Sequence, residues 1–522
     1  MQENTLTIAY GWSFKHTPTH KHQGKHTRNS HRTLVVDTLD PLHTSKTKIQ
    51  EAQWSPLEQA GTLNDWQRLN LSPQWPSQTW WHLLEDSTLS QLVKDALAQH
   101  PTLAQLQAQL EQAQAQVKVV NALRLPQVSL GASYLWQQYG KNQFVFPLQG
   151  RTFHSFQLPI NVSYELDLWG KNKLQRDASK QEMLATTFDL DNARLQLSSA
   201  VVTSYLQYRK LQGLLTLQSQ TEALTRKQYE RLEARHAQGL IADEEGLRQA
   251  HAQWLQAQAE TAVYRQSLAV TQHQLAYLTG HDTSQWQVPE PPETPNTAWF
   301  DARVKKLSDT PLQVGIPSEL AWHRPDIQAQ EALLEAAGIR VKVARKMFLP
   351  SFNIGGSSGL NAIGIQNLFK ASSLNSFLNP TISQPLFTGG VLTGQLTIAK
   401  KQYEALFQAY KDTVLKAYVE VENSFSDLHS HYEVLHLVQA RQEDTRQTEA
   451  QLARKAAQGL STHVEVIPAQ LAHLELEKAV LTQASQCLVS WISLQKTLGG
   501  DTSLERVMPS DSPRKEKADL KK

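Results

Sequence analysis

The chain has 522 residues, enough for about three ordinary domains, so its length alone excludes no class of protein. Lys and Arg total 51 against 49 Asp and Glu, a balance that gives no electrostatic support for a nucleic-acid partner. Mean hydropathy is negative and no window of about 18 consecutive apolar residues occurs, which excludes a helical membrane span. Alternating strands of a transmembrane barrel would escape that test. The single cysteine, Cys487, can form no internal disulfide, and we expect an inert packed residue.

Residues 1–55 are predicted to form a disordered or atypical leader. No apolar core of signal-peptide length is present there, and polar residues surround six histidines. A metal-binding role is an alternative for these histidines, although nothing fixes their geometry. They are His16, His20, His22, His26, His31 and His43.

A helix followed by two strands is predicted at the start of the first repeat, which spans residues 75–280. Apolar residues from Leu103 to Val120 recur in alternating steps of three and four, the heptad pattern of a coiled coil, and the helix stops before Pro126. The period then changes to two, which predicts strands at about 127–138 and 155–168. The second alternation is longer than a soluble strand of about 5–6 residues and suits a tilted membrane crossing.

One long helix is predicted over residues 170–238, because the sequence lacks proline between Pro159 and Pro289. At about 1.5 Å per residue it would extend about 100 Å. Gly239 would supply a left-handed cap at its end, and a returning helix would follow to Leu278. Residues 281–317 are rich in proline and aperiodic, so we expect a linker or equatorial segment there.

The second half of the chain repeats the plan of the first. The segment from Val117 to Pro126 matches residues 341–350 at an offset of 224, and Ala237–Leu240 matches residues 457–460 at an offset of 220. These matches define a second repeat at 318–500, with a long helix at 390–458 capped by Gly459. The strand patterns at 351–360 and 376–387 are weaker, and the duplication is the main reason to predict strands there. Residues 501–522 form a charged tail, which is expected to be disordered.

Four strands per chain cannot close a membrane barrel, since spanning barrels need about eight. An open sheet edge in a bilayer also leaves backbone groups without hydrogen-bond partners. The chain is therefore expected to form oligomers. Two copies would give eight strands with a filled interior, and three copies would give twelve strands around a lumen, continued by a hollow cylinder of helices.

Four segments resemble the TolC and OprM outer membrane efflux proteins, and the resemblance is greatest to the NodT-type branch. They are Tyr164–Lys171, His323–Ile327, Leu349–Phe352 and Gln384–Gly390, and the resemblance extends over about residues 75 to 500. It implies a mainly α fold with transmembrane β: a homotrimer with a twelve-stranded barrel among the outer membrane lipids and an α-helical tunnel across the periplasm. An inner-membrane pump would pass substrates to it through a periplasmic adaptor. Members of this branch have a signal peptide and usually a lipid-anchoring cysteine, and neither is visible here. A mis-set start or a rearranged 5′ end is expected, and a relocated protein is the alternative.

Two glutamates are candidates for a periplasmic gate. Glu245 and Glu465 each lie six residues after the cap glycines Gly239 and Gly459, and threefold symmetry would turn each into a ring that attracts cations. The resemblance implies that acidic residues near this turn line the periplasmic entrance. Glu465 falls on such a position, whereas Pro468 stands where an aspartate is expected. The alternative is that the glutamates only complement the positive end of the returning helix.

Aromatic residues near the end of the first strand are candidates for an interfacial girdle. These are Tyr134, Trp136 and Tyr139, and packing on a soluble sheet is the alternative. The loops at 139–153 and 361–375 would then face the exterior.

No catalytic, metal-binding or cofactor-binding group of residues is recognised, so an enzyme is not expected. The favoured function is a passive duct that exports drugs or other small molecules. A channel for type I protein secretion and a coiled-coil scaffold without transport are the alternatives.

Overall fold

The computed structural model describes residues 79–140, 151–240, 243–290, 293–310, 323–458 and 463–500. It also places four short strands: β1 (Thr7–Ile8), β2 (Trp12–Ser13), β3 (Leu71–Ser72) and β7 (Leu312–Gln313). The chain divides into two compact units. One unit, here called the helical unit, comprises Met1–His100, Arg194–Arg324 and Ala417–Lys522, and the other, the sheet unit, comprises Pro101–Ala193 and Pro325–Lys416. The predicted structural states of the leader at 1–55 and of the tail at 501–522 fall outside the described residues.

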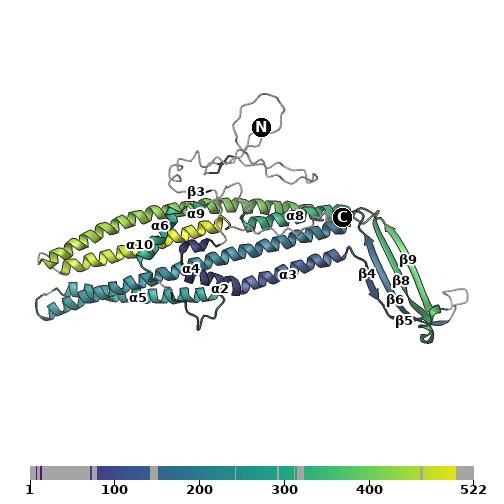
Figure 1. The fold of residues 1–522 in the computed structure, drawn as a ribbon, viewed down its shortest axis with the longest axis horizontal. Helices are drawn as coiled ribbons and strands as arrows, with labels where there is room; N and C mark the ends of the chain where they lie inside the picture. Colours follow the sequence, from purple (N-terminus) through teal and green to yellow (C-terminus); the bar gives the residue numbers. More distant parts are fainter. Residues whose placement is uncertain are drawn as a thin grey trace, which may run out of the picture. The chain divides into compact units, whose positions relative to one another are not determined.

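An antiparallel sheet lies in the sheet unit (Figure 1). Its order is β4-β6-β8-β9, and β5 also pairs with β6. Among the described residues, the outer edges of β4–β5 and of β9 have no strand partner. The strands are β4 (Gln127–Leu130), β5 (Ser133–Gln138), β6 (Thr152–Leu166), β8 (Ser351–Ile363) and β9 (Leu374–Ser383).

The strand bounds differ from the predicted ones in ways that pairing explains. The strand predicted at 127–138 is divided into β4 and β5 at Gly131 and Ala132, although the register opposite β6 continues across the break. β9 ends at Ser383 rather than at residue 387, because Ser383 pairs with Ser351, the first residue of β8. β6 starts three residues earlier than the predicted strand at 155–168 and ends two residues earlier, at Leu166, which pairs with Phe352 in β8.

The sheet has one apolar and one mainly polar face. Side chains alternate between the faces along each strand, and directly paired residues share a face. Register places even-numbered residues opposite even-numbered residues in every pair of this sheet. The even face carries apolar side chains, including Val128, Trp136, Ile160, Leu378 and Ile382.

Two glycines of β8 have different surroundings. A Cβ on Gly359 would lie 2.2 Å from the Leu158 carbonyl oxygen and 2.5 Å from Pro159 Cα, so β6 approaches too closely for a side chain. A Cβ on Gly356 would meet the nearest backbone atom, the Phe377 oxygen, at 3.3 Å. Both glycines lie in a paired strand, and the limit on side-chain size is stricter at Gly359.

The junction between β6 and the long helix is fixed by its own side chains. Asp167 accepts hydrogen bonds from the backbone N–H groups of Asn172 and Lys173 at 3.0 and 2.7 Å, which satisfies donors at the start of the helix. The Trp169 indole donates to the Pro350 carbonyl at 2.7 Å. That bond joins the residues after β6 in the first repeat to the residue before β8 in the second repeat, so the segment Tyr164–Lys171 has a structural role.

Helices of equal length occur in both halves of the chain. α3 (Pro101–Ala122) and α8 (Pro325–Lys346) have 22 residues each, and α4 (Lys171–Ala237) and α9 (Val391–Ala457) have 67 each. α5 (Glu244–Leu278) and α10 (His463–Thr497) have 35 each. α4 and α9 each contribute to both units. None of the described helices is both long and apolar enough to cross a membrane.

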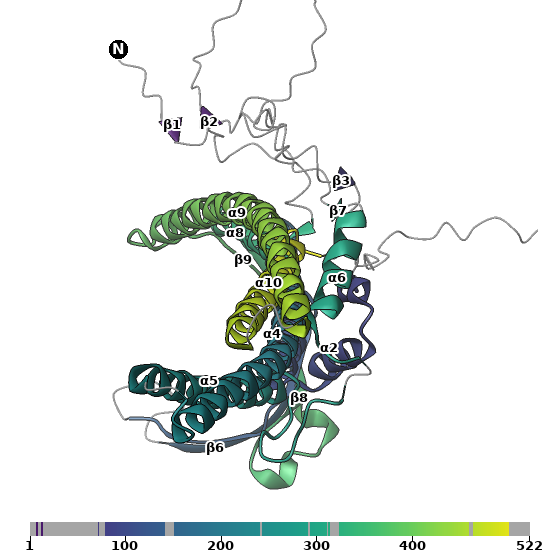
Figure 2. The same cartoon turned by 90° about the vertical axis from the view of Figure 1, so that its left-hand side faces the viewer.

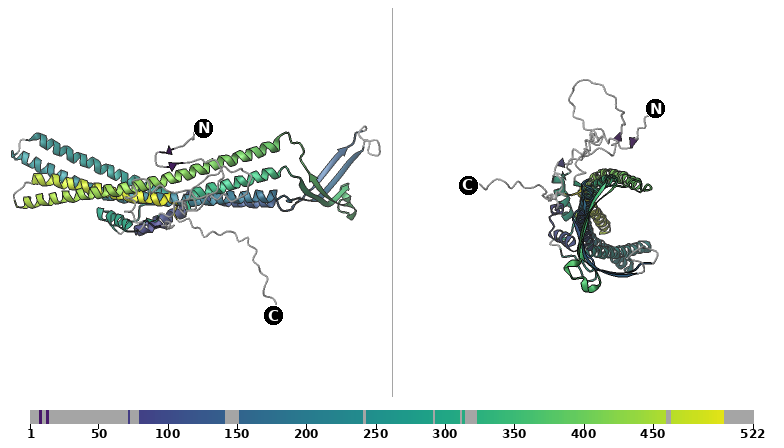
Figure 3. Two further views of the ribbon diagram at one scale, coloured as in Figure 1. Left: turned by 90° about the horizontal axis from the view of Figure 1, so that it is seen from above. Right: turned by 90° about the vertical axis from the view of Figure 1, so that its right-hand side faces the viewer.

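Two helical hairpins lie in the helical unit, and Figure 3 shows α5 beside α4 and α10 beside α9. Polar side chains connect the helices within and between the hairpins. Gln218 of α4 donates to the Ala257 carbonyl of α5 at 3.0 Å. Its own amide oxygen accepts from the buried Lys478 ammonium of α10 at 2.5 Å.

The core of the helical unit includes elements that the sequence analysis did not predict. η1 (Trp80–Leu84) and α2 (Ser87–Gln99) precede α3, and α6 (Thr297–Asp309) lies inside the segment predicted to be an aperiodic linker. The expectation of aperiodic structure was wrong for residues 297–309, whereas the role of 281–317 as a linker or equatorial segment stays a prediction. The Asn296 side chain accepts from Trp299 N and caps α6, which packs on α10 (Figure 2).

A group of buried polar side chains ties these elements to α4. The Tyr205 hydroxyl, fully buried, donates to Asp86 at 2.8 Å, and burial raises the pKa of this tyrosine. Asp86 also caps α2 by accepting from Leu89 N at 3.0 Å. Arg209 is fully buried and donates to the Glu293 carbonyl at 2.7 Å. These bonds hold the start of α2 and the segment before α6 against α4.

Candidate functional site

The turn after α4 ends the helix with a left-handed glycine. Gly239 has a φ of +69°, a backbone conformation that favours glycine. Its N–H donates to the His236 carbonyl, and the next N–H, of Leu240, donates to the Arg235 carbonyl, both at 2.9 Å. These two bonds form a Schellman motif and satisfy the last carbonyls of α4.

Three consecutive acidic residues at the start of α5 make different contacts. Asp243 is the N-cap, because its carboxylate accepts from Gly246 N at 2.9 Å. Glu244 forms an exposed ion pair with Arg248 at 3.6 Å. Glu245 is exposed and has no hydrogen-bond or ion-pair partner among the described residues. The specific capping bond therefore belongs to Asp243, which leaves the Glu245 carboxylate available to act on solvent ions.

The equivalent turn between α9 and α10 is described only in part. α9 ends at Ala457, and Gly459 lies outside the described residues. The backbone of α10 begins at His463, which places Glu465 in its first turn. Pro468 lies inside α10. Glu245 and Glu465 thus come from corresponding ends of two different hairpins within one chain.

The three girdle candidates lie on or beside β5. The Tyr134 hydroxyl lies 2.7 Å from His154 Nδ1, and its ring packs against Phe156 with centroids 4.9 Å apart. Trp136 is 56% exposed on the apolar face. Tyr139, just after β5, contacts Phe153 edge to face at 5.4 Å. Tyr134 and Trp136 are exposed on the apolar face, where rings with polar atoms are suited to a membrane interface, whereas Tyr139 is half-buried at an odd-numbered position.

Sequence reasoning missed an aromatic cluster between α4 and α5. The Tyr229 ring stacks on Trp254 with centroids 5.7 Å apart and contacts His251 at 4.9 Å. The Tyr229 hydroxyl donates to Glu233 at 2.8 Å. Aromatic residues 25 positions apart on the two arms of a predicted hairpin were the available signal.

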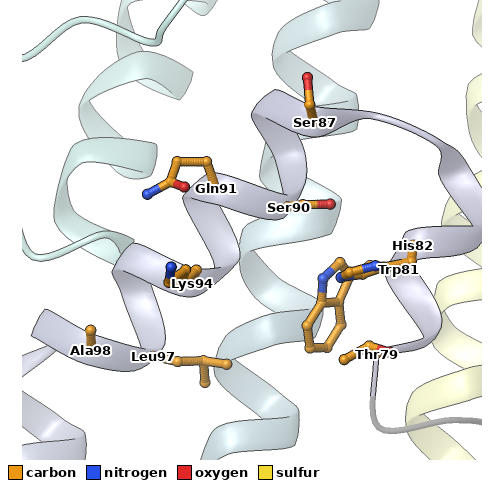
Figure 4. Close-up of a pocket in the computed structure, with 9 residues that line it drawn as sticks. All are labelled: Thr79, Trp81, His82, Ser87, Ser90, Gln91, Lys94, Leu97 and Ala98. Carbon is orange, nitrogen blue, oxygen red and sulfur yellow. The ribbon is translucent and has the colours of Figure 1, made fainter.

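A depression of about 760 Å³ beside η1 and α2 was also not predicted. Figure 4 shows Trp81 on one side of it and Lys94 and Leu97 of α2 on the other. It includes none of the predicted site residues. Elsewhere in the described part of the chain, no cluster of three or more His, Cys, Asp or Glu is arranged to bind a metal ion.

Comparison with known proteins identifies the family. The family model for outer membrane efflux proteins matches residues 92–281 and 316–500, which together are well over half of the chain. The chain belongs to the outer membrane efflux protein family. The resemblance found in the sequence is confirmed, and this member of the family is an outer membrane channel of an efflux system.

Named relatives cover most of this outer membrane efflux protein. The pyoverdine export outer membrane protein OpmQ of Pseudomonas putida is 29% identical over 446 residues, which are 81% of this chain and 88% of the relative. The multidrug resistance outer membrane protein MdtP of Shigella flexneri is 26% identical over 442 residues, which are 82% of this chain and 87% of the relative. The solved CmeC outer membrane channel of Campylobacter jejuni shares the fold, with a TM-score of 0.74 at 22% identity over 83% of this chain and 89% of that one.

Proposed function

We propose that three copies of this chain close a twelve-stranded barrel in the outer membrane, and that their long helices continue it as a passive duct for small molecules. The observation that carries the proposal is the sheet itself. One of its faces is apolar and exposed, and among the described residues both of its edges lack a partner. A bilayer would cover the apolar face, and neighbouring copies would satisfy the edges.

The partners follow from the kind of system in which the relatives act. OpmQ is named as an outer membrane protein of pyoverdine export, and MdtP as an outer membrane protein of multidrug resistance. By analogy with such export systems, an inner-membrane pump would supply this duct with substrate through a periplasmic adaptor. The adaptor would bind near the helix turns, at residues 235–245 and 454–465.

We further propose that Glu245 and Glu465 form rings of negative charge at the narrow end of the duct. The exposure of Glu245, together with the assignment of the capping bond to Asp243, supports this role. Three carboxylates per ring would attract cations and slow anions.

The assembly is tested by extracting cell envelopes with detergent and measuring the mass of the particle. A trimer from the outer membrane fraction is expected. A monomer recovered from the soluble fraction, after export with a working signal peptide, would contradict the duct.

The gate is tested in planar bilayers with Glu245→Gln and Glu465→Gln combined. We expect higher conductance or weaker block by divalent cations, because the rings lose their charge. Glu244→Gln is the matched control, since Glu244 is paired with Arg248 at 3.6 Å. An unchanged conductance and block in the double variant would leave the two glutamates with a structural role only.

A further inference from the structure

We propose that β9 of one copy pairs antiparallel with β4–β5 of the next copy, with Phe377 opposite Gln137 and Leu378 opposite Trp136. This inference rests on the proposed trimer and specifies its strand register. The partner is a second copy of this chain, because the evidence for the register comes from the chain's own repeat.

The two hairpins of the sheet have the same register. In the first, Gln127 is opposite Ser163, and in the second, Ser351 is opposite Ser383. Ser351 follows Gln127 by 224 positions, and Ser383 follows Ser163 by 220. These are the two offsets that the sequence shows on either side of the hairpins. The first strands of the two repeats therefore correspond at an offset of 224 positions, and the second strands correspond at an offset of 220.

One junction between repeats is already visible within the chain. β6, the second strand of the first repeat, pairs with β8, the first strand of the second repeat. The equivalent junction would join β9, the second strand of the second repeat, to β4–β5, the first strand of the first repeat. Those are the two free edges of the described sheet. Within one chain they are separated by β6 and β8, so a neighbouring copy has to supply the contact.

The two offsets convert the observed register of the β6–β8 pair within one chain into an expected register for β9 and β4–β5 between copies. Gln157 is opposite Asn361 in the β6–β8 pair. Phe377 follows Gln157 by 220 positions, and Gln137 precedes Asn361 by 224, so Phe377 is assigned opposite Gln137. By the same rule Leu158 and Leu360, which are opposite each other, assign Leu378 opposite Trp136.

The assigned register keeps the two faces of the sheet continuous. Even-numbered residues again meet even-numbered residues, so Trp136 and Leu378, which are 56% and 74% exposed, extend the apolar face across the junction. A slip by one residue would place the apolar side chains of β9 on the polar face.

The same register gives a partner to residues beyond the end of β9. Leu386 is 93% exposed in the single chain, and the rule places it opposite Val128, which is 66% exposed. Its counterpart Leu166 is still within β6, because it pairs with Phe352. We expect the strand to lengthen past Ser383 when a neighbouring copy supplies β4.

Cysteine cross-linking in the outer membrane tests the register. Gln137→Cys with Phe377→Cys, made in a Cys487→Ala background, should form disulfides between copies, because directly opposite residues have a suitable Cα separation of about 5 Å. The matched controls combine Gln137→Cys with Asn375→Cys or with Asn379→Cys, which lie on the same face two positions to either side. Within one chain the edges are about 14 Å apart across three strand spacings, so no internal disulfide competes.

The expected result is a covalent trimer on a non-reducing gel, formed severalfold more completely by the Phe377 pair than by either control pair. Particle mass is measured for every variant, including each single cysteine. Trimers in which a displaced pair cross-links best, or in which no pair does, would overturn the register and leave the proposed duct intact. Particles of the parent protein that are not trimers would overturn the duct and the register together.

Discussion

The helical unit and the sheet differ in where their apolar side chains are buried. In the helical unit, Trp80 is 2% exposed and contacts Trp491 of α10 with ring centroids 5.8 Å apart. In the sheet, every residue of β9 is exposed. The first unit thus builds its core from a single chain, whereas the sheet leaves its apolar face uncovered within one chain, as the proposed barrel requires. Four predictions test this difference.

The largest effect is expected from Trp80→Ala. Removing this buried ring should lower the free energy of unfolding by about 3–5 kcal/mol, because it leaves a cavity beside Trp491. Trp136→Ala, at a position 56% exposed, should change it by about 0.5 kcal/mol or less. Thermal unfolding of the detergent-solubilised protein, followed by circular dichroism, measures both. Equal losses for the two variants would contradict a self-contained core in the helical unit.

Gly359→Ala should damage the sheet without affecting the helical unit. Its Cβ would lie 2.2 Å from the Leu158 oxygen, and separating β6 from β8 should cost about 1–3 kcal/mol. Gly356→Ala, whose Cβ meets the nearest backbone oxygen at 3.3 Å, is the milder control. The readout is the fraction of heat-resistant oligomer on a gel. Full oligomer in Gly359→Ala would mean that the two strands can separate at little cost.

Tyr205→Phe should lower the free energy of unfolding by about 1–2 kcal/mol, because the buried hydroxyl donates to Asp86 at 2.8 Å. Tyr208→Phe is a matched control on the same helix. The comparison uses chemical unfolding monitored by tryptophan fluorescence, to which Trp80 and Trp491 contribute. Identical unfolding transitions for Tyr205→Phe and the parent would show that the hydrogen bond from Tyr205 to Asp86 adds nothing to stability.

The smallest effect is expected in the chemical labelling of Cys487 in the native protein. Burial raises the pKa of this thiol to about 12, and only the thiolate reacts, so the native protein should resist a maleimide at pH 8 and react after unfolding. As pH rises toward 12 the reactive fraction should increase. Asn379→Cys on exposed β9, in a Cys487→Ala background, should react at once. Mass spectrometry counts the added groups, and rapid native labelling of Cys487 would show that the core opens readily.

Periodicity was enough to predict the long elements of the fold. The helix predicted at 170–238 is α4 at Lys171–Ala237, because a proline-free run of helix formers leaves few other conformations. Cys487 is buried, as its helical surroundings indicated. The family was predicted from four short segments, and the comparisons confirm it.

Elements that depend on tertiary contact were harder to predict. The signal for α6 was present in Asn296 followed by Trp299, Phe300, Val304 and Leu307, but the surrounding prolines outweighed it. The end of β9 at Ser383 depends on where β8 begins, which no local pattern reveals. The Tyr205–Asp86 bond joins residues 119 positions apart, and sequence alone gives no distance over that span.

The change from an offset of 224 to one of 220 has a practical consequence. Both hairpins keep their register, so the four-residue difference between the repeats is confined to the segments that connect the equivalent pairs Trp136–His154 and Leu360–Leu374. Those segments are residues 137–153 and 361–373, with 17 and 13 residues. Those loops have already accepted a change of length without disturbing the strands. An epitope tag inserted there should leave the strands intact, and labelling of intact cells would test the prediction that these loops face the exterior.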